Sequence, residues 1–325
     1  MSYLNKALFQ KYVRESLLLF IFTAIGLFAF AWFRVWIVSE VDTARFQQIL
    51  DLLPKDWRRF SAVDFDWIIS YLGRTSLTLD EPMITMLCAL WCIVRGSDVV
   101  SGELNRGTME MVLSQPISRS RVYIQHAVLT VGGLLVLMLL IWLGMAIAVW
   151  TTSIDEITYP TFKVPLTSIK IPITYFGPQT ETVSMLARVQ PIQFLPGIIN
   201  LFCFGFFITS FSMLFSSWDQ FRWRTLGIVV GIYFVQGMLK VGALGSEKLF
   251  WMKYLTFFSL YEPALSVEIA DTRPEQLFYL LRVDEVGQTI GLSPLSYNLL
   301  LLALAIVFFY VGMQIFRKRD LPAPL

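Results

Sequence analysis

Few side chains in this sequence could perform chemistry, and their spacing does not suit a catalytic or metal centre. His126 is the only histidine in 325 residues, which excludes a triad of histidines, an HExxH motif and any metal site with two histidine ligands. The three cysteines, Cys88, Cys92 and Cys203, lie in apolar stretches, and an odd number there is no disulfide framework. Cys88 and Cys92 share a helical face and could hold Cu(I), but such cysteines mostly pack as small apolar side chains. We expect neither a metal site nor an enzyme.

The composition instead predicts a membrane protein. Hydrophobic residues make up 56% of the chain and charged residues only 15%, against about 25% charged residues in ordinary globular proteins. The mean hydropathy is +0.62. A chain with so few polar residues can cover its surface only if lipid covers the rest. The net charge of +2 gives no argument for a nucleic-acid partner, and we expect none.

Six stretches are long and apolar enough to cross a membrane. A bilayer core of about 30 Å requires about 20 apolar residues in a helix. The six candidates are 17–38, 76–94, 122–150, 191–215, 225–244 and 295–316. The second has only a short uninterrupted apolar run, and Pro196-Gly197 interrupts the fourth near its start, which a membrane helix tolerates. We predict an all-α polytopic membrane protein, with residues 1–325 forming a single transmembrane domain.

The distribution of basic residues predicts which way these spans face. With six spans, both termini lie on one side of the membrane. The segments on that side, 1–16, 95–121, 216–224 and 317–325, hold 12 Lys and Arg in 61 residues; the opposite segments, 39–75, 151–190 and 245–294, hold 12 in 127. The basic residues are therefore about twice as dense on the side of the termini. We expect a multi-pass protein of the cytoplasmic (inner) membrane with cytoplasmic termini.

The segments outside the spans have structural preferences of their own. Residues 1–16 place Leu4, Leu8 and Tyr12 on one helical face, which predicts an interfacial helix in contact with membrane lipid. Residues 39–75 have near-helical apolar spacing, and 245–294 are partly helical in pattern. Four prolines among β-branched residues favour an extended chain over 158–178.

The loop 95–121 carries the most local structural information. Gly107 is suited to end one helix and Thr108 to cap the next, and Glu110 puts an acid in the first turn, where the helix dipole favours it. Met109, Val112 and Leu113 then form an apolar stripe at i, i+3 and i+4. The pattern predicts a short amphipathic helix parallel to the membrane, which needs lipid headgroups or a soluble partner to cover its stripe.

Residues 102–119 resemble a signature of ABC-2 type transporter permeases. They read Gly-Glu-Leu-Asn-Arg-Gly-Thr-Met-Glu-Met-Val-Leu-Ser-Gln-Pro-Ile-Ser-Arg, and the signature has Gly-Glu followed by Gly-Thr-x-Glu-x-Leu-Leu-Ser-x-Pro-Val/Ile-Ser-Arg. The resemblance extends to the six spans, the N-terminal helix and the short basic turn between spans four and five. The segments 39–75 and 151–190 are longer than in the shortest family members, which suggests a specialised role on that side.

The resemblance implies that the loop is a coupling helix for a separate ATP-binding cassette ATPase. The implied contact residues are Glu103, Thr108, Glu110, Val112 and Leu113. The sequence has no Gly-Lys dipeptide and hence no GxxxxGK[ST] phosphate loop. We therefore expect no cofactor in this chain, with ATP and Mg²⁺ bound by the partner subunit.

Charged residues near the ends of the spans are candidates for a translocation path. Arg34 is expected to reach the outer interface, or alternatively to line a pore while paired with Asp80 or Glu81. Asp80 and Glu81 precede a helix, where its dipole favours them; a substrate or cation contact at the outer mouth is the alternative. Lys240 is expected to reach the outer interface as well.

Gly227 and Gly231 form a GxxxG step in span five, which lets two helix backbones approach closely. The resemblance implies a dimer contact through spans one and five. Packing of the two glycines within one protomer is the alternative.

These features together favour a permease subunit that moves an unidentified substrate, with export as the direction implied by the resemblance. The working complex would hold a second permease copy or homologue and two ATPase subunits. The alternatives are a membrane scaffold that recruits an ATPase or an outer-face partner without transport, and an intramembrane enzyme, which the scarcity of catalytic side chains argues against.

Overall fold

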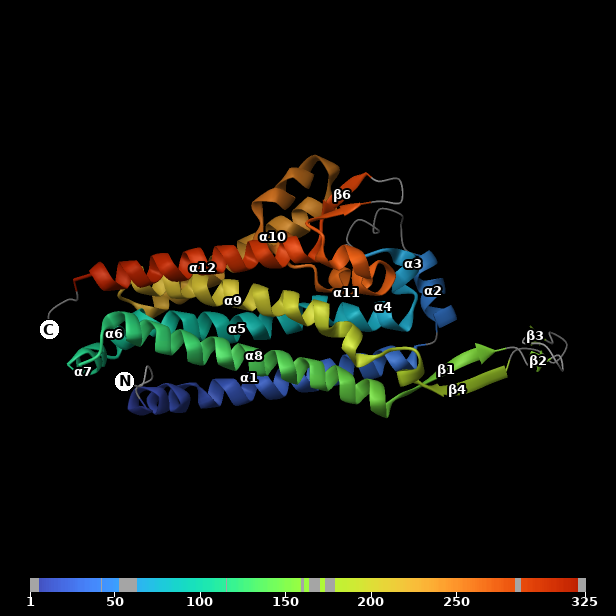
Figure 1. Cartoon of the computed structure of the whole chain (residues 1–325), viewed down its shortest axis with the longest axis horizontal. Coiled ribbons are helices and arrows are strands. Elements are labelled where there is room, and N and C mark those ends of the chain that lie inside the picture. Colours follow the sequence, from blue (N-terminus) through green and yellow to red (C-terminus); the bar gives the residue numbers. More distant parts are fainter. Residues whose placement is uncertain are drawn as a thin grey trace.

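A computed structural model of the chain describes residues 6–41, 43–52, 63–114, 116–158, 161–163, 170–172, 179–283 and 288–320. Long helices run side by side along the longest axis of the molecule (Figure 1). Both the beginning of α1 (Lys6–Glu40) and the end of α12 (Pro294–Lys318) lie at one end of this bundle. We refer to it as the terminal end, and to the other as the opposite end.

Six helical segments are long and apolar enough to cross a membrane, which confirms the predicted fold class. They are Lys6–Glu40, Tyr71–Asn105, Arg119–Thr151, Pro191–Trp218, Arg222–Gly245 and Pro294–Lys318. Each contains one predicted span. The second is built from α4 (Tyr71–Ser76), the 3₁₀ turn η2 (Leu77–Asp80), α5 (Pro82–Ser97), the π-helical turn η3 (Asp98–Gly102) and α6 (Glu103–Asn105).

The helix α9 (Leu195–Trp218) is central to the packing. It contacts α12, α5, α8 (Arg119–Thr151) and α11 (Pro263–Thr272). The core includes the fully buried side chains Trp91 and Phe204, and the Trp91 indole N–H donates to the carbonyl of Thr130 at 3.0 Å. Pro196 stands in the first turn of α9, directly after the 3₁₀ turn η6 (Pro191–Phe194), so it begins the helix instead of interrupting it.

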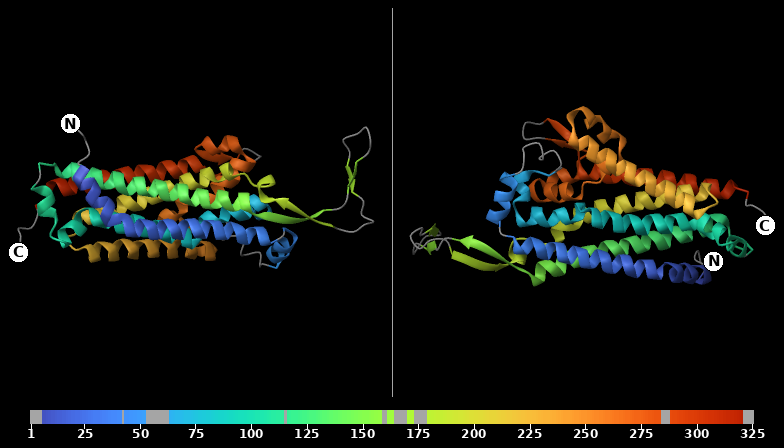
Figure 2. Two further views of the ribbon diagram at one scale, coloured as in Figure 1. Left: turned by 90° about the horizontal axis from the view of Figure 1, so that it is seen from below. Right: turned by 180° about the vertical axis from the view of Figure 1, so that it is seen from behind.

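Residues 6–16 are helical, as predicted, and are continuous with the first span. The first turns of α1 bend away from the rest of the helix (Figure 2). Leu8 and Tyr12 are buried against Val112 and Val122. The apolar stripe of this segment therefore packs on protein, where the sequence pattern predicted contact with headgroups, because the loop after the second span folds back over it.

The opposite end holds the shorter elements. On one side lie α2 (Thr43–Asp51) and α3 (Phe65–Ile68). After α10 (Arg222–Gly245) come three 3₁₀ segments, α11 and a hairpin, namely η7 (Glu247–Leu255), η8 (Phe257–Leu260), η9 (Pro274–Phe278), β5 (Leu281–Val283) and β6 (Thr289–Leu292). These elements confirm the partly helical character predicted for the segments around them.

A long antiparallel ribbon follows α8 and projects beyond the bundle (Figures 1 and 2). Its strand β1 (Ser153–Thr158) pairs with β4 (Gln179–Ser184), and β2 (Thr161–Lys163) pairs with β3 (Lys170–Pro172). These strands agree with the extended chain predicted there, and the remainder of 158–178 lies outside the described residues. The 3₁₀ turn η5 (Met185–Ala187) leads back to the bundle.

Candidate functional site at the 95–121 loop and the opposite-end cavity

The loop after the second span folds as a compact unit at the terminal end. Gly107 has a φ of +69°, the left-handed conformation that ends helices and favours glycine. The predicted amphipathic helix is α7 (Met109–Leu113). The Ser118 side chain accepts the backbone N–H of Arg121 and so caps α8. These local signals position the ends of the loop.

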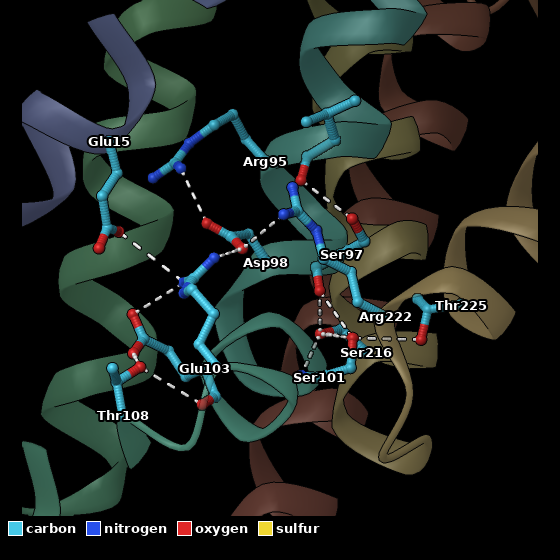
Figure 3. Close-up of polar contacts among 12 residues, drawn as sticks. Glu15, Arg95, Ser97, Asp98, Ser101, Glu103, Thr108, Ser216, Arg222 and Thr225 are labelled. Atoms are coloured by element: carbon cyan, nitrogen blue, oxygen red, sulfur yellow. Dashed lines mark hydrogen bonds and ion pairs between the residues drawn. The ribbon is translucent and has the colours of Figure 1, made fainter. Parts of the chain in front are cut away.

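Glu103 is fully buried at the centre of this unit, and Figure 3 shows it beside Thr108. The ammonium of Lys11 donates to both carboxylate oxygens, at 2.8 and 2.7 Å. Arg106 donates at 3.2 Å, and the Thr108 hydroxyl also donates to the carboxylate. Thr108 therefore holds Glu103 and makes no side-chain cap for α7. A buried charge is tolerated only with such compensation.

Asp98 forms a second buried acidic centre, one turn before Glu103. It accepts from Arg95 at 3.0 Å and from Arg106 at 2.7 Å, and an Arg222 nitrogen lies 3.5 Å away (Figure 3). Although burial lowers it, the hydrogen bond and charge of Asp98 raise the pKa of Arg106 above its ordinary value. Arg106 thus stays cationic and bridges the two acids.

The π-helical turn is held by a hydroxyl of a different span. Such a turn breaks the regular i to i−4 ladder and needs other partners for its backbone groups. Ser216 accepts the backbone N–H groups of Val100 and Ser101 at 3.2 and 3.0 Å and donates to the carbonyl of Ser97 at 2.8 Å. The Thr225 hydroxyl donates to that of Ser101 at 3.2 Å. The loop is thereby connected to α9 and α10 (Figure 3).

The structure divides the five loop residues implied as ATPase contacts into two groups. Glu103 and Val112 are buried, and Thr108 and Leu113 are partly buried. Glu110 is exposed, and so is the neighbouring Met111, at 71%. The apolar stripe faces the chain itself, since Met109 and Val112 pack in its core clusters. The surface that α7 presents therefore includes the acid Glu110 and the apolar Met111.

Sequence reasoning missed several residues that hold the loop together. Lys11, Arg95, Asp98 and Arg106 were not singled out, and neither was Ser216. Arg106 and Asp98 could have been found, because they stand three residues after and five before Glu103. Lys11 and Ser216 carry no local signal, since they lie in other spans.

Two ion pairs lie near the opposite end. Arg34 donates to Glu81 at 3.0 Å, so the alternative in which these two residues pair is the one observed. Lys240 contacts groups that the sequence did not point to. Its ammonium donates to the carbonyls of Phe258 and Tyr261 and forms an ion pair with Glu262, each at 3.1 Å, because these groups converge beside α10.

A cavity of about 1040 Å³ lies between α10 and the elements that lead into α5. Its walls are mostly apolar, and Asp80, Lys240 and Glu262 stand among them. Of the three predicted path residues, Asp80 lines this cavity, whereas Arg34 and Glu81 pair with each other outside its lining.

The GxxxG step of α10 faces away from the described part of this chain. A Cβ added at Gly227 or Gly231 would meet no described heavy atom within 4 Å, apart from its own helix backbone and chain neighbours. The alternative of packing within one protomer is therefore not what the structure shows, and the glycine face is left for lipid or another subunit.

The remaining candidates for chemistry serve as packing groups. Cys88, Cys92 and Cys203 are buried thiols, and the described residues contain no group of three or more metal-ligating side chains. His126 is fully buried, with Nε2 3.2 Å from Arg95 and its ring edge-on to Tyr12 at 4.9 Å.

Six helices long and apolar enough to cross a membrane define the class of multi-pass membrane proteins. The family model described as "ABC-2 family transporter protein" matches residues 9–321, and the chain belongs to this family. It is accordingly a permease of an ABC transporter, a membrane transport component that is not itself the catalytic subunit. No curated protein matches the sequence.

Proposed function

We propose that this permease exports a substrate across the cytoplasmic membrane, driven by a separate ATP-binding cassette ATPase that docks on α7. The terminal end of the bundle then faces the cytoplasm, in line with its denser basic residues. ATP and Mg²⁺ bind in the partner, because the sequence has no Gly-Lys dipeptide and therefore no phosphate loop.

The observation that carries this proposal is the way α7 is joined to the spans. Glu110 and Met111 are exposed, while the loop behind them is held by buried ion pairs. Lys11 connects Glu103 to α1, and Arg222 connects Asp98 to α10. A force applied to α7 therefore reaches two membrane helices through short, buried contacts, as a coupling element requires.

Transport would follow from alternating access. Closure of the ATPase shifts α7, and the polar contacts at Asp98 and Ser216 carry that shift to α5, α9 and α10. We propose that two permease copies, or this chain and a homologue, assemble in surrounding lipid. The open face at Gly227 and Gly231 supports a contact between α10 helices.

Copurification in mild detergent tests the ATPase contact. The permease should bring down an ATP-binding cassette subunit in equal amount, and Glu110→Lys should remove it because Glu110 is exposed on α7. Glu275→Lys, the same charge reversal on an exposed residue of η9, should leave the complex intact. The proposal is wrong if both variants retain the subunit, or if both lose it.

ATP-dependent flux in proteoliposomes then separates transport from a scaffold role. Coupled hydrolysis and substrate movement support the permease, while a stable complex without flux supports the scaffold. Glu103→Lys is expected to act differently from Glu110→Lys: it disrupts the buried cluster and so lowers the melting temperature as well.

A further inference from the structure

The opposite-end cavity holds charged side chains within apolar walls. Asp80, Lys240 and Glu262 line it together with aromatic residues such as Phe234 and Phe258. A second lysine of the wall, Lys253, lies over the Phe250 ring, 5.8 Å from its centroid. The charged side chains that are not paired within the chain are the ones that could bind a ligand.

Lys240 is engaged by groups of the chain itself. Its ammonium donates to the carbonyls of Phe258 and Tyr261, each at 3.1 Å, and forms an ion pair with the Glu262 carboxylate, also at 3.1 Å. Lys240 and Glu262 therefore compensate each other.

Asp80 differs from Glu262 in its ion pairing. The charged side chains that act on it are Glu262, Lys240 and Glu81. Lys240 is engaged by Glu262, and Arg34 is paired with Glu81 at 3.0 Å. No ion pair to Asp80 is found in the described part of the chain. Asp80 is therefore the wall acid whose carboxyl could pair with a cationic ligand.

We propose that this cavity binds a hydrophobic cation, with Asp80 holding the positive group and the apolar walls enclosing the body. The volume of about 1040 Å³ suits a drug-sized molecule, for which pockets of about 300–1,000 Å³ are typical. A carboxylate in apolar surroundings is stabilised when a ligand with a positive charge pairs with it. Aromatic walls attract cations as well.

This inference rests on the proposed function only in treating the ligand as a transport substrate. Binding itself needs neither the ATPase nor ATP. The test therefore uses the intact permease alone, in phosphatidylcholine nanodiscs whose lipid carries no net charge.

The first measurement is equilibrium binding of radiolabelled tetraphenylphosphonium, with tetraphenylborate as a probe of similar shape and opposite charge. Saturable binding of the cation, without competition from the anion, is expected. Asp80→Asn should weaken it by at least about tenfold. Glu81→Gln removes the adjacent carboxylate, which is paired with Arg34 outside the cavity lining, and should leave the affinity within about twofold.

A second pair of variants tests the location without altering charge. Met86 lines the cavity and Met83 does not; both stand on α5 with similar exposure, 45% and 48%. Met86→Trp should abolish binding and Met83→Trp should retain it.

The proposal is overturned by absence of saturable binding, which would mean that lipid or a second copy fills the cavity. It is equally overturned if Asp80→Asn binds like the wild type, or if matched variants lose binding alike. Binding without ATPase association would instead refute only the proposed function.

Discussion

The Lys11 ammonium lies 2.7 Å from Oε2 of Glu103, although the two residues are 92 positions apart. The contact joins the beginning of the first span to the loop after the second. It is asymmetric in exposure, because the Lys11 side chain is 29% exposed and that of Glu103 only 1%. The cost of losing the contact therefore falls mainly on the buried acid.

Lys11→Met should lower the free energy of unfolding by about 1–2 kcal/mol, because Glu103 keeps Arg106 and Thr108 but loses its lysine. Thermal unfolding of the purified permease measures this. In a double-mutant cycle with Glu103→Gln, the two changes should be less than additive. Strict additivity would show that the pair contributes no coupling energy.

Ser216→Ala should destabilise the π-helical turn by about 1–3 kcal/mol, since it leaves two buried N–H groups without their acceptor. Hydrogen exchange at Val100 and Ser101 should become faster. Ser266→Ala is the matched control, because this buried hydroxyl donates only to Glu262 of its own helix turn. Unchanged exchange in Ser216→Ala would contradict the assigned role.

Gly144→Ala should weaken the packing of α1 on α8. An added Cβ would come within 2.7 Å of the Phe28 carbonyl oxygen, which is backbone and cannot rotate away. We expect a loss of about 1–3 kcal/mol, read as a lower melting temperature.

Gly132→Ala provides the comparison on the same helix. A Cβ there meets nothing described within 4 Å, so the higher helix propensity of alanine should leave stability equal or slightly increased, by up to about 1 kcal/mol. Equal effects at both glycines would contradict the close approach at Gly144.

Glu268 should make the opposite end more stable at mildly acidic pH. Burial raises the pKa of this carboxyl above its ordinary 4.5, although the backbone N–H of Asp64 and two arginines act in the other direction. An acid with a raised folded-state pKa costs stability while ionised. That cost is full above the folded pKa and fades as pH falls toward the unfolded value.

Melting temperatures of the wild type and Glu268→Gln, compared from about pH 7 to about pH 4.5, check this prediction. The advantage of the variant should be greatest at the higher pH and shrink as the pH falls. A difference that does not change with pH would show that ionisation of Glu268 is not involved.

Most of the fold was predictable because its signals are local. Runs of about 20 apolar residues predict spans wherever they occur, and all six were found in the structure. The helix break at Gly107 depends on neighbouring residues and also followed from the sequence. The loop motif predicted the family that the comparison then confirmed.

The candidate site was only partly predictable. The pairing of Arg34 with Glu81 stood among the alternatives, whereas the contacts of Lys240 with Glu262 and two carbonyls were not predicted. Its acceptors come from the segment after η7, and a sequence pattern does not show which carbonyls converge on one ammonium. The five implied ATPase contacts stay a prediction. Glu110 is exposed, and the Glu110→Lys variant in the copurification experiment tests it.

The sequence alone thus determined the membrane class, the six spans and the position of the loop, because hydrophobic run length and helix capping act within a few residues. Only the tertiary structure decided that Glu103 is buried against Lys11, that Ser216 holds the π-helical turn, and that Asp80 faces a cavity without a counter-ion. Each of these features requires contact between residues that lie far apart in the sequence. Burial and pairing depend on how the segments pack together, so no single segment determines them.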